Sequence, residues 1–493
     1  MRDGQVLTDY EAVTPLRRPE PPEGDEAAPA EGAARALDGA SEPGARRRGG
    51  SKKVRPAKLH AERWVAGRSH FFTYVGLFLF TTFVFFRPYE LFSMPALNEG
   101  AQWLALLTIL AYIPSQFATE GNLTARPPEV ILALLLLVAA LLSVPTATNP
   151  GEAWDNVVEF SKVVLIFVVA VNVMRTERRL RGLLVLVLAA SVMLSFSALN
   201  DYWQGRLNFQ GERVKGMLGG LFGNPNDLAL HLVTMVPLAV ALAFARRGSL
   251  KKVAYLLCAA LFTAGVVASF SRGGFLGLVA SAGVMAWKFG RKRRLFVVAV
   301  AAVALLIFVA AAPGDYGMRL ASMFGGDVTG SATARQALFW RSVVVALRHP
   351  LTGVGLGCFY HQGAHDQVTH NAYTQVASEM GLAALVVYFL FMVMPLRRLR
   401  EIEREALGAK DRATFYYLAV GLQASLVGYM VCSFFASVAH LWYVYYLVAY
   451  SVSLRRIYAL RFGEEGLRQA EKKEGANAPD AGEAPAAVAG LTL

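Results

Sequence analysis

One histidine and several arginines are the side chains of this sequence whose types and positions suit a chemical reaction. His370 is followed directly by Asn371, at the start of a segment that leads into an apolar run, and Arg272 lies between two apolar runs. A histidine with a pKa near neutrality can take a proton from a hydroxyl group. A fixed guanidinium group can stabilise negative charge that develops during a reaction. These residues therefore suggest a base together with an anion-binding group.

Both residues also have a purely structural interpretation. Arg272 precedes two glycines, which permit a close approach of the backbone. It could hold an anionic lipid-linked substrate, because ionisable residues at membrane depth are functional candidates by default. It could equally anchor a helix end as a snorkelling arginine. His370 and Asn371 could likewise serve only as a pair that caps a helix at the membrane interface.

A glycine-rich stretch adds two more cations. Arg213 and Lys215 are followed by four glycines and then by the run Asn224-Pro225-Asn226-Asp227. Asn226 or Asp227 is predicted to cap the helix that follows. Free backbone N–H groups in a glycine-rich turn at a helix N-terminus suit a phosphate. The alternative is a plain re-entrant turn with a capped helix.

Residues 331–349 are predicted to form an amphipathic helix. Apolar side chains recur there at near-helical spacing, and Pro350 ends the pattern. Such a helix would lie on the membrane surface and present Arg335, Arg341 and Arg348.

The polar residues after His370 are candidates as well, because Tyr373, Gln375 and Glu379 could line a polar cleft at the mouth of the next apolar run. The candidate site thus has a catalytic pair and a set of substrate-binding residues. The catalytic pair is His370 and Arg272, and the substrate-binding residues are Arg213, Lys215, Arg335, Arg341, Asn371 and Tyr373.

Two further patterns are given no function. Residues 352–357 carry three glycines that resemble a nucleotide-binding motif, but no strand of a βαβ unit precedes them, so we interpret them as a turn. His361 and His365 are four residues apart with Asp366 beside the second, yet no third ligand has a firm spacing. The sequence therefore predicts neither a metal nor a cofactor.

The composition excludes a soluble protein of this size. Of the 493 residues, 55% are hydrophobic and 17% are charged, which indicates a polytopic membrane protein. The net charge of +13 could suggest nucleic acid, but the basic residues gather in connections between apolar runs. No nucleic-acid partner is predicted. The three cysteines have neither disulfide nor metal spacing.

Twelve apolar runs of roughly spanning length follow one another. Backbone groups in lipid must be satisfied within the segment, so the fold is predicted to be an all-α polytopic membrane protein with about twelve transmembrane helices. The runs cover residues 70–86, 101–117, 129–145, 157–174, 182–200, 227–245, 253–270, 273–289, 295–312, 380–396, 414–434 and 438–454. Residues 313–379 form one large outer loop with short amphipathic helices.

The basic residues fix the orientation by the positive-inside rule. Clusters of arginine and lysine follow every even-numbered run from the fourth onward, and the alternating connections are poor in them for their length. Both termini are therefore predicted to be cytoplasmic. Residues 1–65 and 464–493 have biased compositions and are predicted to be disordered tails on either side of a membrane domain at 70–460.

An ordered set of short motifs resembles the O-antigen ligase and polymerase superfamily. The resemblance covers residues 70–460, and its specificity lies in the order of the motifs on a twelve-helix frame with one large late loop. The motifs are F-x-N-P-N-x-L-A (222–229), S-R-G-G-F-L (271–276), R-x-x-x-x-W (335–340), P-L-x-G-V-G-x-G-x-F (350–359) and H-N-x-Y-x-Q-x-x-x-E-x-G (370–381).

The resemblance implies a membrane glycosyltransferase. Such enzymes take a glycan from undecaprenyl diphosphate at the periplasmic face of the bacterial inner membrane and pass it to an acceptor hydroxyl. They serve the biosynthesis of surface polysaccharides such as lipopolysaccharide or exopolysaccharide, and family members work without a metal. By position, Arg213 and Arg272 match the family's diphosphate-binding arginines, and His370 matches its essential loop histidine.

Three alternatives accompany the expectation of an O-antigen ligase. A ligase would use the lipid A core as acceptor, whereas a polymerase would use another lipid-linked repeat. A transporter or flippase would show paired intramembrane charges and interrupted helices in both halves. Here the polar residues gather at the outer face and the halves do not repeat. A non-catalytic scaffold does not explain the outer arginines.

Overall fold

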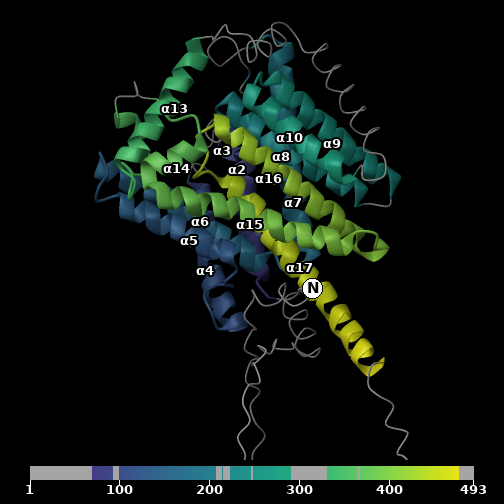
Figure 1. The fold of residues 1–493 in the computed structure, drawn as a ribbon. Coiled ribbons are helices and arrows are strands. Elements are labelled where there is room, and N and C mark those ends of the chain that lie inside the picture. Colours follow the sequence, from purple (N-terminus) through teal and green to yellow (C-terminus); the bar gives the residue numbers. More distant parts are fainter. Residues whose placement is uncertain are drawn as a thin grey trace, which may run out of the picture.

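The computed structural model describes residues 69–92, 99–206, 214, 222–245, 248–289, 330–362 and 367–476. Within these ranges every regular element is a helix, which confirms the predicted all-α class (Figure 1). The tail at 1–65 and the predicted run at 295–312 lie outside the described residues. The last helix continues to Ala476, which lies within the segment predicted to be a disordered tail.

The elements follow the predicted apolar runs. In chain order they are α2 (Phe71–Phe86), α3 (Pro88–Phe92), α4 (Gly100–Glu120), α5 (Pro128–Ser143), α6 (Pro150–Val173), α7 (Glu177–Trp203), α8 (Pro225–Phe244), α9 (Ser249–Ala268), α10 (Arg272–Phe289), α13 (Gly330–Arg348), η3 (Phe359–Gln362), α14 (Ala372–Met380), α15 (Leu382–Ala406), η4 (Lys410–Arg412), α16 (Ala413–Cys432), η5 (Ser433–Phe435) and α17 (Trp442–Ala476).

Several helices begin before their apolar run, because polar residues at the membrane interface supply caps. α6 begins at Pro150, although its apolar run was predicted to begin at residue 157. The side chain of Asn149 accepts a hydrogen bond from the Glu152 N–H, and proline is favoured at the first helical position. The start of a helix is therefore set by its cap and not by the first apolar residue.

Seven of the described helical segments are long and apolar enough to cross a membrane. They are α4, α6, α7, α8, α9, α15 and the segment Lys410–Phe435 that contains α16, and the apolar helices α2 and α5 are shorter. The chain is therefore a membrane protein by the length and composition of its helices. The full count of twelve spans stays a prediction.

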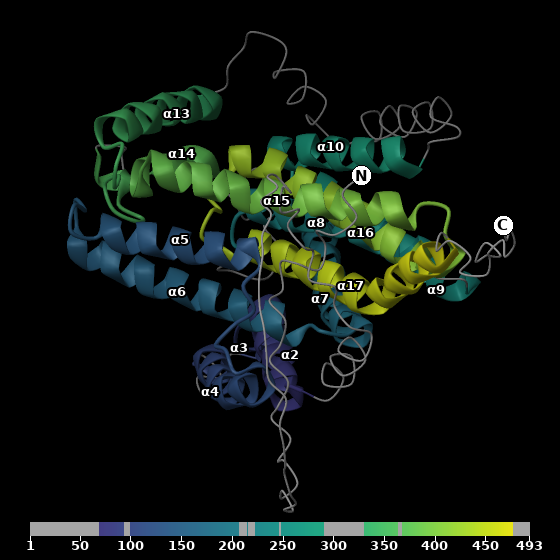
Figure 2. The same ribbon diagram turned by 60° about the horizontal axis from the view of Figure 1, so that its bottom comes forward.

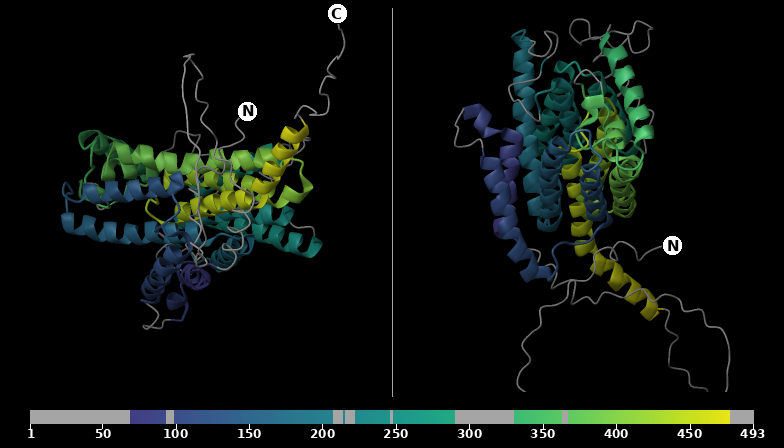
Figure 3. Two further views of the ribbon diagram at one scale, coloured as in Figure 1. Left: turned by 90° about the horizontal axis from the view of Figure 1, so that it is seen from below. Right: turned by 90° about the vertical axis from the view of Figure 1, so that its left-hand side faces the viewer.

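The helices form one bundle in which α8 and α16 are the most buried of the seven segments. α8 packs against both α9 and α16, and α10 packs against both α16 and α8. Figure 2 shows α13 lying along α14 at one edge of the bundle, and these two helices are in contact. In Figure 3, α17 leaves the bundle at the end opposite to the start of α13.

At one end of the bundle, the α5–α6 connection is joined to the turn at 350–357. The Thr148 N–H donates to the Val354 carbonyl at 2.9 Å, and the Thr146 hydroxyl donates to that of Thr352 at 2.8 Å. Both segments were predicted to lie on the outer side, so their contact agrees with the predicted alternation of the connections. We call this the outer end.

At the opposite, inner end the bundle is tied by buried ion pairs. Glu120 lies 2.7 Å from the guanidinium groups of both Arg175 and Arg456. Arg455 lies 3.3 Å from Glu129 in the same region of α17. From their sequence positions these arginines were expected only to be charges on cytoplasmic connections. The structure shows instead that they join α4, α5, α6 and α17.

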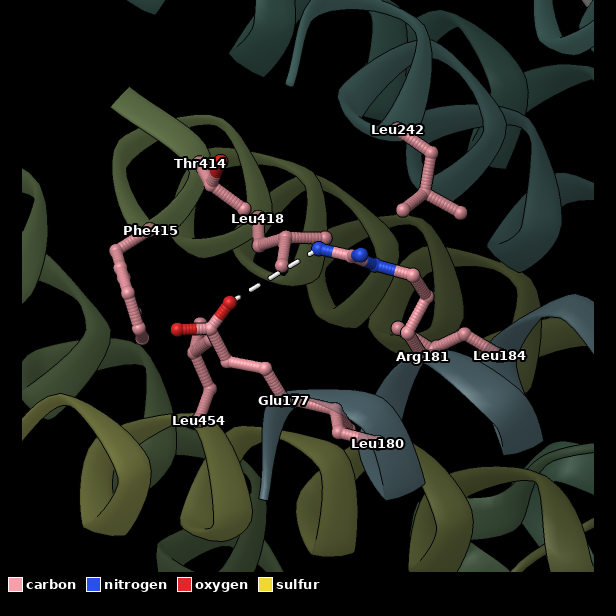
Figure 4. A pocket seen from close by; sticks show the side chains of 9 residues that line it. All are labelled: Glu177, Leu180, Arg181, Leu184, Leu242, Thr414, Phe415, Leu418 and Leu454. Atoms are coloured by element: carbon pink, nitrogen blue, oxygen red, sulfur yellow. Dashed lines mark ion pairs between the residues drawn. The ribbon is translucent and has the colours of Figure 1, made fainter. Parts of the chain in front are cut away.

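A small pocket also lies at the inner end. Figure 4 shows Glu177 and Arg181 of α7 on its wall, 3.9 Å apart, with leucines of α7, α8, α16 and α17 around them. Most of its lining is apolar, and the Glu177 carboxylate is paired with both Arg181 and Arg461. The candidate residues of the sequence analysis lie at the other end.

Removal of the Glu120 carboxylate is predicted to destabilise the protein strongly. Glu120→Ala leaves Arg175 and Arg456 without the carboxylate that they share, which costs about 3–5 kcal/mol when a buried pair loses one partner. Thermal unfolding in detergent measures the loss. Glu159→Ala is the control, because its exposed pair with Lys162 is worth no more than about 1 kcal/mol. Equal shifts of the two melting temperatures would refute the role of Glu120.

The orientation is predicted to appear in cysteine labelling of intact cells. Leu351 is exposed at the outer end and Leu250 is exposed at the start of α9, at the inner end. With Cys258, Cys358 and Cys432 replaced by alanine, Leu351→Cys should react with a maleimide that cannot cross the inner membrane. Leu250→Cys should react only after that membrane is permeabilised. The reverse pattern would invert the proposed orientation.

Candidate active site

Arg272 begins α10, and the preceding serine fixes its position. The Ser271 hydroxyl donates to the side-chain oxygen of Asn226 at 2.9 Å and accepts from the Gly274 N–H at 3.1 Å. The first turn of α10 is thereby joined to the first turn of α8. The pair of glycines permits close packing of protein on protein, since a Cβ at Gly274 would lie 2.6 Å from that of Ala229.

The cap of α8 differs from the prediction. Asn224 is the cap residue, and its side chain accepts from the Asn226 N–H at 2.9 Å, with Pro225 at the first helical position. The prediction of Asn226 or Asp227 was therefore wrong by two or three residues. Because Asn224 holds the helix end, the side chain of Asn226 is available to Ser271.

His370 has an unusual backbone conformation. Its φ of 52° lies in the left-handed region, which costs a residue with a side chain about 1–2 kcal/mol. The neighbouring Asn371 caps α14, because its side-chain oxygen accepts from the N–H groups of Tyr373 at 2.9 Å and Thr374 at 3.1 Å. The capping interpretation of this pair is thus correct for Asn371. The His370 side chain has no part in the cap.

α14 is a separate short helix and not the start of α15. Gly381 interrupts the two helices with a φ of 90°. The turn at 350–357 holds the end of α14, since the Val354 N–H donates to the Ser378 carbonyl at 2.9 Å and the Gly355 N–H donates to the Glu379 carbonyl at 3.1 Å. The predicted turn therefore positions the helix that follows His370.

Arg272, Arg335 and His370 are brought together by these elements. Burial lowers the pKa of His370 to about 4, and the charge of Arg335 lowers it further in the same direction. Burial and then the charge of Arg272 lower the pKa of Arg335. Among the described residues, neither guanidinium group has an ion-pair partner. The cluster of Arg272, Arg335 and His370 is therefore a half-buried cationic site with a neutral imidazole at its edge.

The other residues predicted for the site either bond to backbone carbonyls or lie outside the described ranges. Arg341 is on α13 as well, but its guanidinium group donates to the Gln362 carbonyl. Tyr373 uses its hydroxyl as a donor to the Met430 carbonyl at 2.8 Å. Arg213 and Lys215 lie outside the described residues.

The polar side chains after Tyr373 face the protein interior and do not line an open cleft. Asn371, Gln375 and Glu379 are buried and recur every four residues, so they share one side of α14. Burial raises the pKa of Glu379 to about 8, which makes it a neutral hydrogen-bonding group near neutral pH. These side chains therefore lie in the protein interior.

His361 has a carboxylate partner. Its Nε2 lies 2.7 Å from a carboxylate oxygen of Glu152 on α6. His365 and Asp366, the other two residues of that pattern, lie outside the described residues. The contact between His361 and Glu152 adds a further link between η3 and α6 at the outer end.

One wall of the candidate site was not predicted from the sequence: the connection between α16 and α17 at residues 433–441. Phe435 packs against Gly273, beside Arg272, and the Ser437 hydroxyl lies 3.0 Å from that of Thr369, beside His370. Phe434 contacts Tyr373 of α14. The concentration of serine, phenylalanine and histidine in so short an outer connection was the available signal.

The fold and the cluster define a class of protein: a membrane protein that is helical throughout its described ranges, with two cations and a histidine gathered at one end of its bundle. The family model described as O-antigen ligase matches residues 257–389, which include Arg272, Arg335 and His370. The resemblance to the O-antigen ligase and polymerase superfamily is therefore confirmed over residues 257–389. No curated protein matches the chain.

Substitution of Arg335 is predicted to raise the pKa of His370. Arg335→Gln removes a positive charge that disfavours the imidazolium form, and it retains a side chain of similar length. The pH dependence of carbethoxylation of His370, followed by mass spectrometry, reports this pKa because only neutral imidazole reacts. Its midpoint should move upward in Arg335→Gln. It should not move in Arg348→Gln, which removes an exposed arginine at the other end of α13. An unchanged midpoint in Arg335→Gln would show that the charge of Arg335 does not act on the imidazole of His370.

Proposed function

We propose that the protein transfers a glycan from undecaprenyl diphosphate to an acceptor hydroxyl, as an O-antigen ligase does, at the periplasmic face of the inner membrane. The observation that carries this proposal is the cluster of Arg272, Arg335 and His370 at the outer end of the bundle. The family match over residues 257–389 supports the same type of reaction in polysaccharide biosynthesis.

The two arginines would act on the donor. During transfer, the bond between the anomeric carbon and the diphosphate oxygen breaks, and its electron pair goes to the diphosphate. In this proposal the guanidinium groups of Arg272 and Arg335 would hold the phosphate oxygens and stabilise this charge, with each such donor typically worth about 3–4 kcal/mol. Charge stabilisation of this kind needs no metal ion, which is why we expect metal-independent transfer.

His370 would act on the acceptor. The acceptor oxygen forms the new bond to the anomeric carbon while the imidazole takes the hydroxyl proton, which contributes about 10²–10⁴ to the rate. Burial and Arg335 keep the imidazole neutral in the free protein. A bound diphosphate would offset the charge of Arg335, so the pKa of His370 would rise and the base would become stronger when the donor is in place.

The remaining predicted residues take supporting roles in this proposal. Asn371 and Tyr373 position His370 and its helix through the cap and through the bond to Met430. Arg341 would contribute to the positive field at the outer end, and Arg213 and Lys215 stay predicted ligands of the diphosphate. The acceptor is the lipid A core in a ligase and a second lipid-linked repeat in a polymerase.

Loss of either central side chain is predicted to abolish transfer without loss of insertion. Arg272→Ala should lower the rate by about 10²–10³, and His370→Ala should lower it by about 10²–10⁴. The assay uses proteoliposomes with the undecaprenyl-diphosphate-linked glycan of the producing cell and both acceptors. Product analysis separates a glycan transferred to the lipid A core from a longer lipid-linked glycan and from unchanged glycan on the other leaflet.

Arg348→Ala is the matched control, because Arg348 is an exposed arginine on α13 away from the cluster. It should retain the wild-type rate. Wild-type transfer by stable Arg272→Ala or His370→Ala protein would refute the assignment of the site. Unchanged glycan on the other leaflet would instead indicate a flippase.

A further inference from the structure

The connection between α16 and α17 exposes an aromatic ring beside the cluster. Phe434 is 48% exposed, although Ser433 before it and Ala436 after it are buried. Phe434 lies at the outer end of the candidate membrane span Lys410–Phe435, so its exposed ring is available to a ligand that reaches the cluster from the membrane interface.

The ring is held by neighbours from three elements. Its centroid lies 5.9 Å from that of Phe339 on α13, 6.4 Å from that of Tyr373 on α14 and 5.4 Å from that of Phe435. The hydroxyl of Tyr373 is occupied by the Met430 carbonyl, which fixes its ring in turn. Phe434 is therefore a preorganised apolar surface and not a freely moving side chain.

The same neighbours connect Phe434 to each charged residue of the site. Phe339 lies four residues, or one helical turn, after Arg335. Phe435 packs on Gly273 beside Arg272, and Ser437 is hydrogen-bonded to Thr369 beside His370. The ring thus belongs to a connection that lies against all three parts of the cluster.

We propose that Phe434 is the platform on which the sugar ring attached to the diphosphate stacks. This inference rests on the proposed function and adds a determinant of donor binding to it. One face of a pyranose presents C–H groups, which are attracted to the negative face of an aromatic ring and lose apolar surface to it. The polar groups that fix a sugar's orientation lie around an aromatic surface in sites of this kind.

The placement favours the sugar over the lipid tail. In the donor, the sugar is on one side of the diphosphate and the polyprenyl chain is on the other. His370 must lie on the sugar side, because it acts on the hydroxyl that attacks the anomeric carbon. Phe434 contacts Tyr373 of the helix that follows His370, and its own connection is bonded to Thr369. The ring is therefore on the sugar side as well.

Equilibrium binding of two ligands to the full-length protein in nanodiscs, with no acceptor present, tests the proposal. One ligand is undecaprenyl diphosphate, and the other is the undecaprenyl-diphosphate-linked glycan extracted from the producing cell. Phe434→Ala should weaken binding of the glycan-bearing ligand by roughly tenfold, as expected for loss of one aromatic contact. It should leave the dissociation constant of undecaprenyl diphosphate within about twofold of wild type. Phe434→Trp should retain binding of both ligands.

The control is Trp103→Ala, which removes an exposed aromatic residue of α4 that is not part of the site and should change neither constant. Equal weakening of both ligands by Phe434→Ala would place the ring on the lipid or diphosphate side and overturn the proposal. No effect on either ligand would overturn it too. If the wild-type protein bound neither ligand, the proposed function itself would fail and the platform would fail with it.

Discussion

Two like charges, for which the described part of the chain supplies no ion-pair partner, are the constraint on which the outer end of this protein depends. Arg272 and Arg335 are half-buried and close enough to affect one another, and Arg335 acts in the same way on His370. Such repulsion is unfavourable in the empty protein, so the surrounding packing must hold it. The Ser271–Asn226 hydrogen bond fixes α10, and the turn at 350–357 fixes α14. A diphosphate would relieve the repulsion, which is the physical reason for assigning one here.

The inner end shows the opposite arrangement of charge. There Glu120 neutralises Arg175 and Arg456, and Glu129 neutralises Arg455, so the arginines join helices instead of offering a site. The number of arginines at one end of the bundle therefore does not show whether they bind a ligand or stabilise the fold. What distinguishes Arg272 and Arg335 from the arginines of the inner end is that no carboxylate among the described residues forms an ion pair with them.

Much of the fold could be predicted from the sequence, because apolar runs in a membrane have one way to satisfy their backbone. Arg272 and His370 could also be singled out as candidates from the sequence, since an ionisable residue at a membrane boundary is conspicuous. Other features depend on the folded backbone. The cap fell on Asn224 because that residue, and not Asn226, has the extended conformation before the helix. Phe434 was missed because its neighbours, Phe339 and Tyr373, are distant in the sequence.

The central claim is that the cluster of Arg272, Arg335 and His370 binds the diphosphate of a lipid-linked donor. A cryo-electron microscopy structure of the protein in nanodiscs with undecaprenyl diphosphate tests it most directly. We predict phosphate oxygens at about 2.7–3.2 Å from the guanidinium groups of Arg272 and Arg335, with His370 beside them. A diphosphate bound elsewhere, for example among the arginines of the inner end, with this cluster unoccupied, would contradict the account.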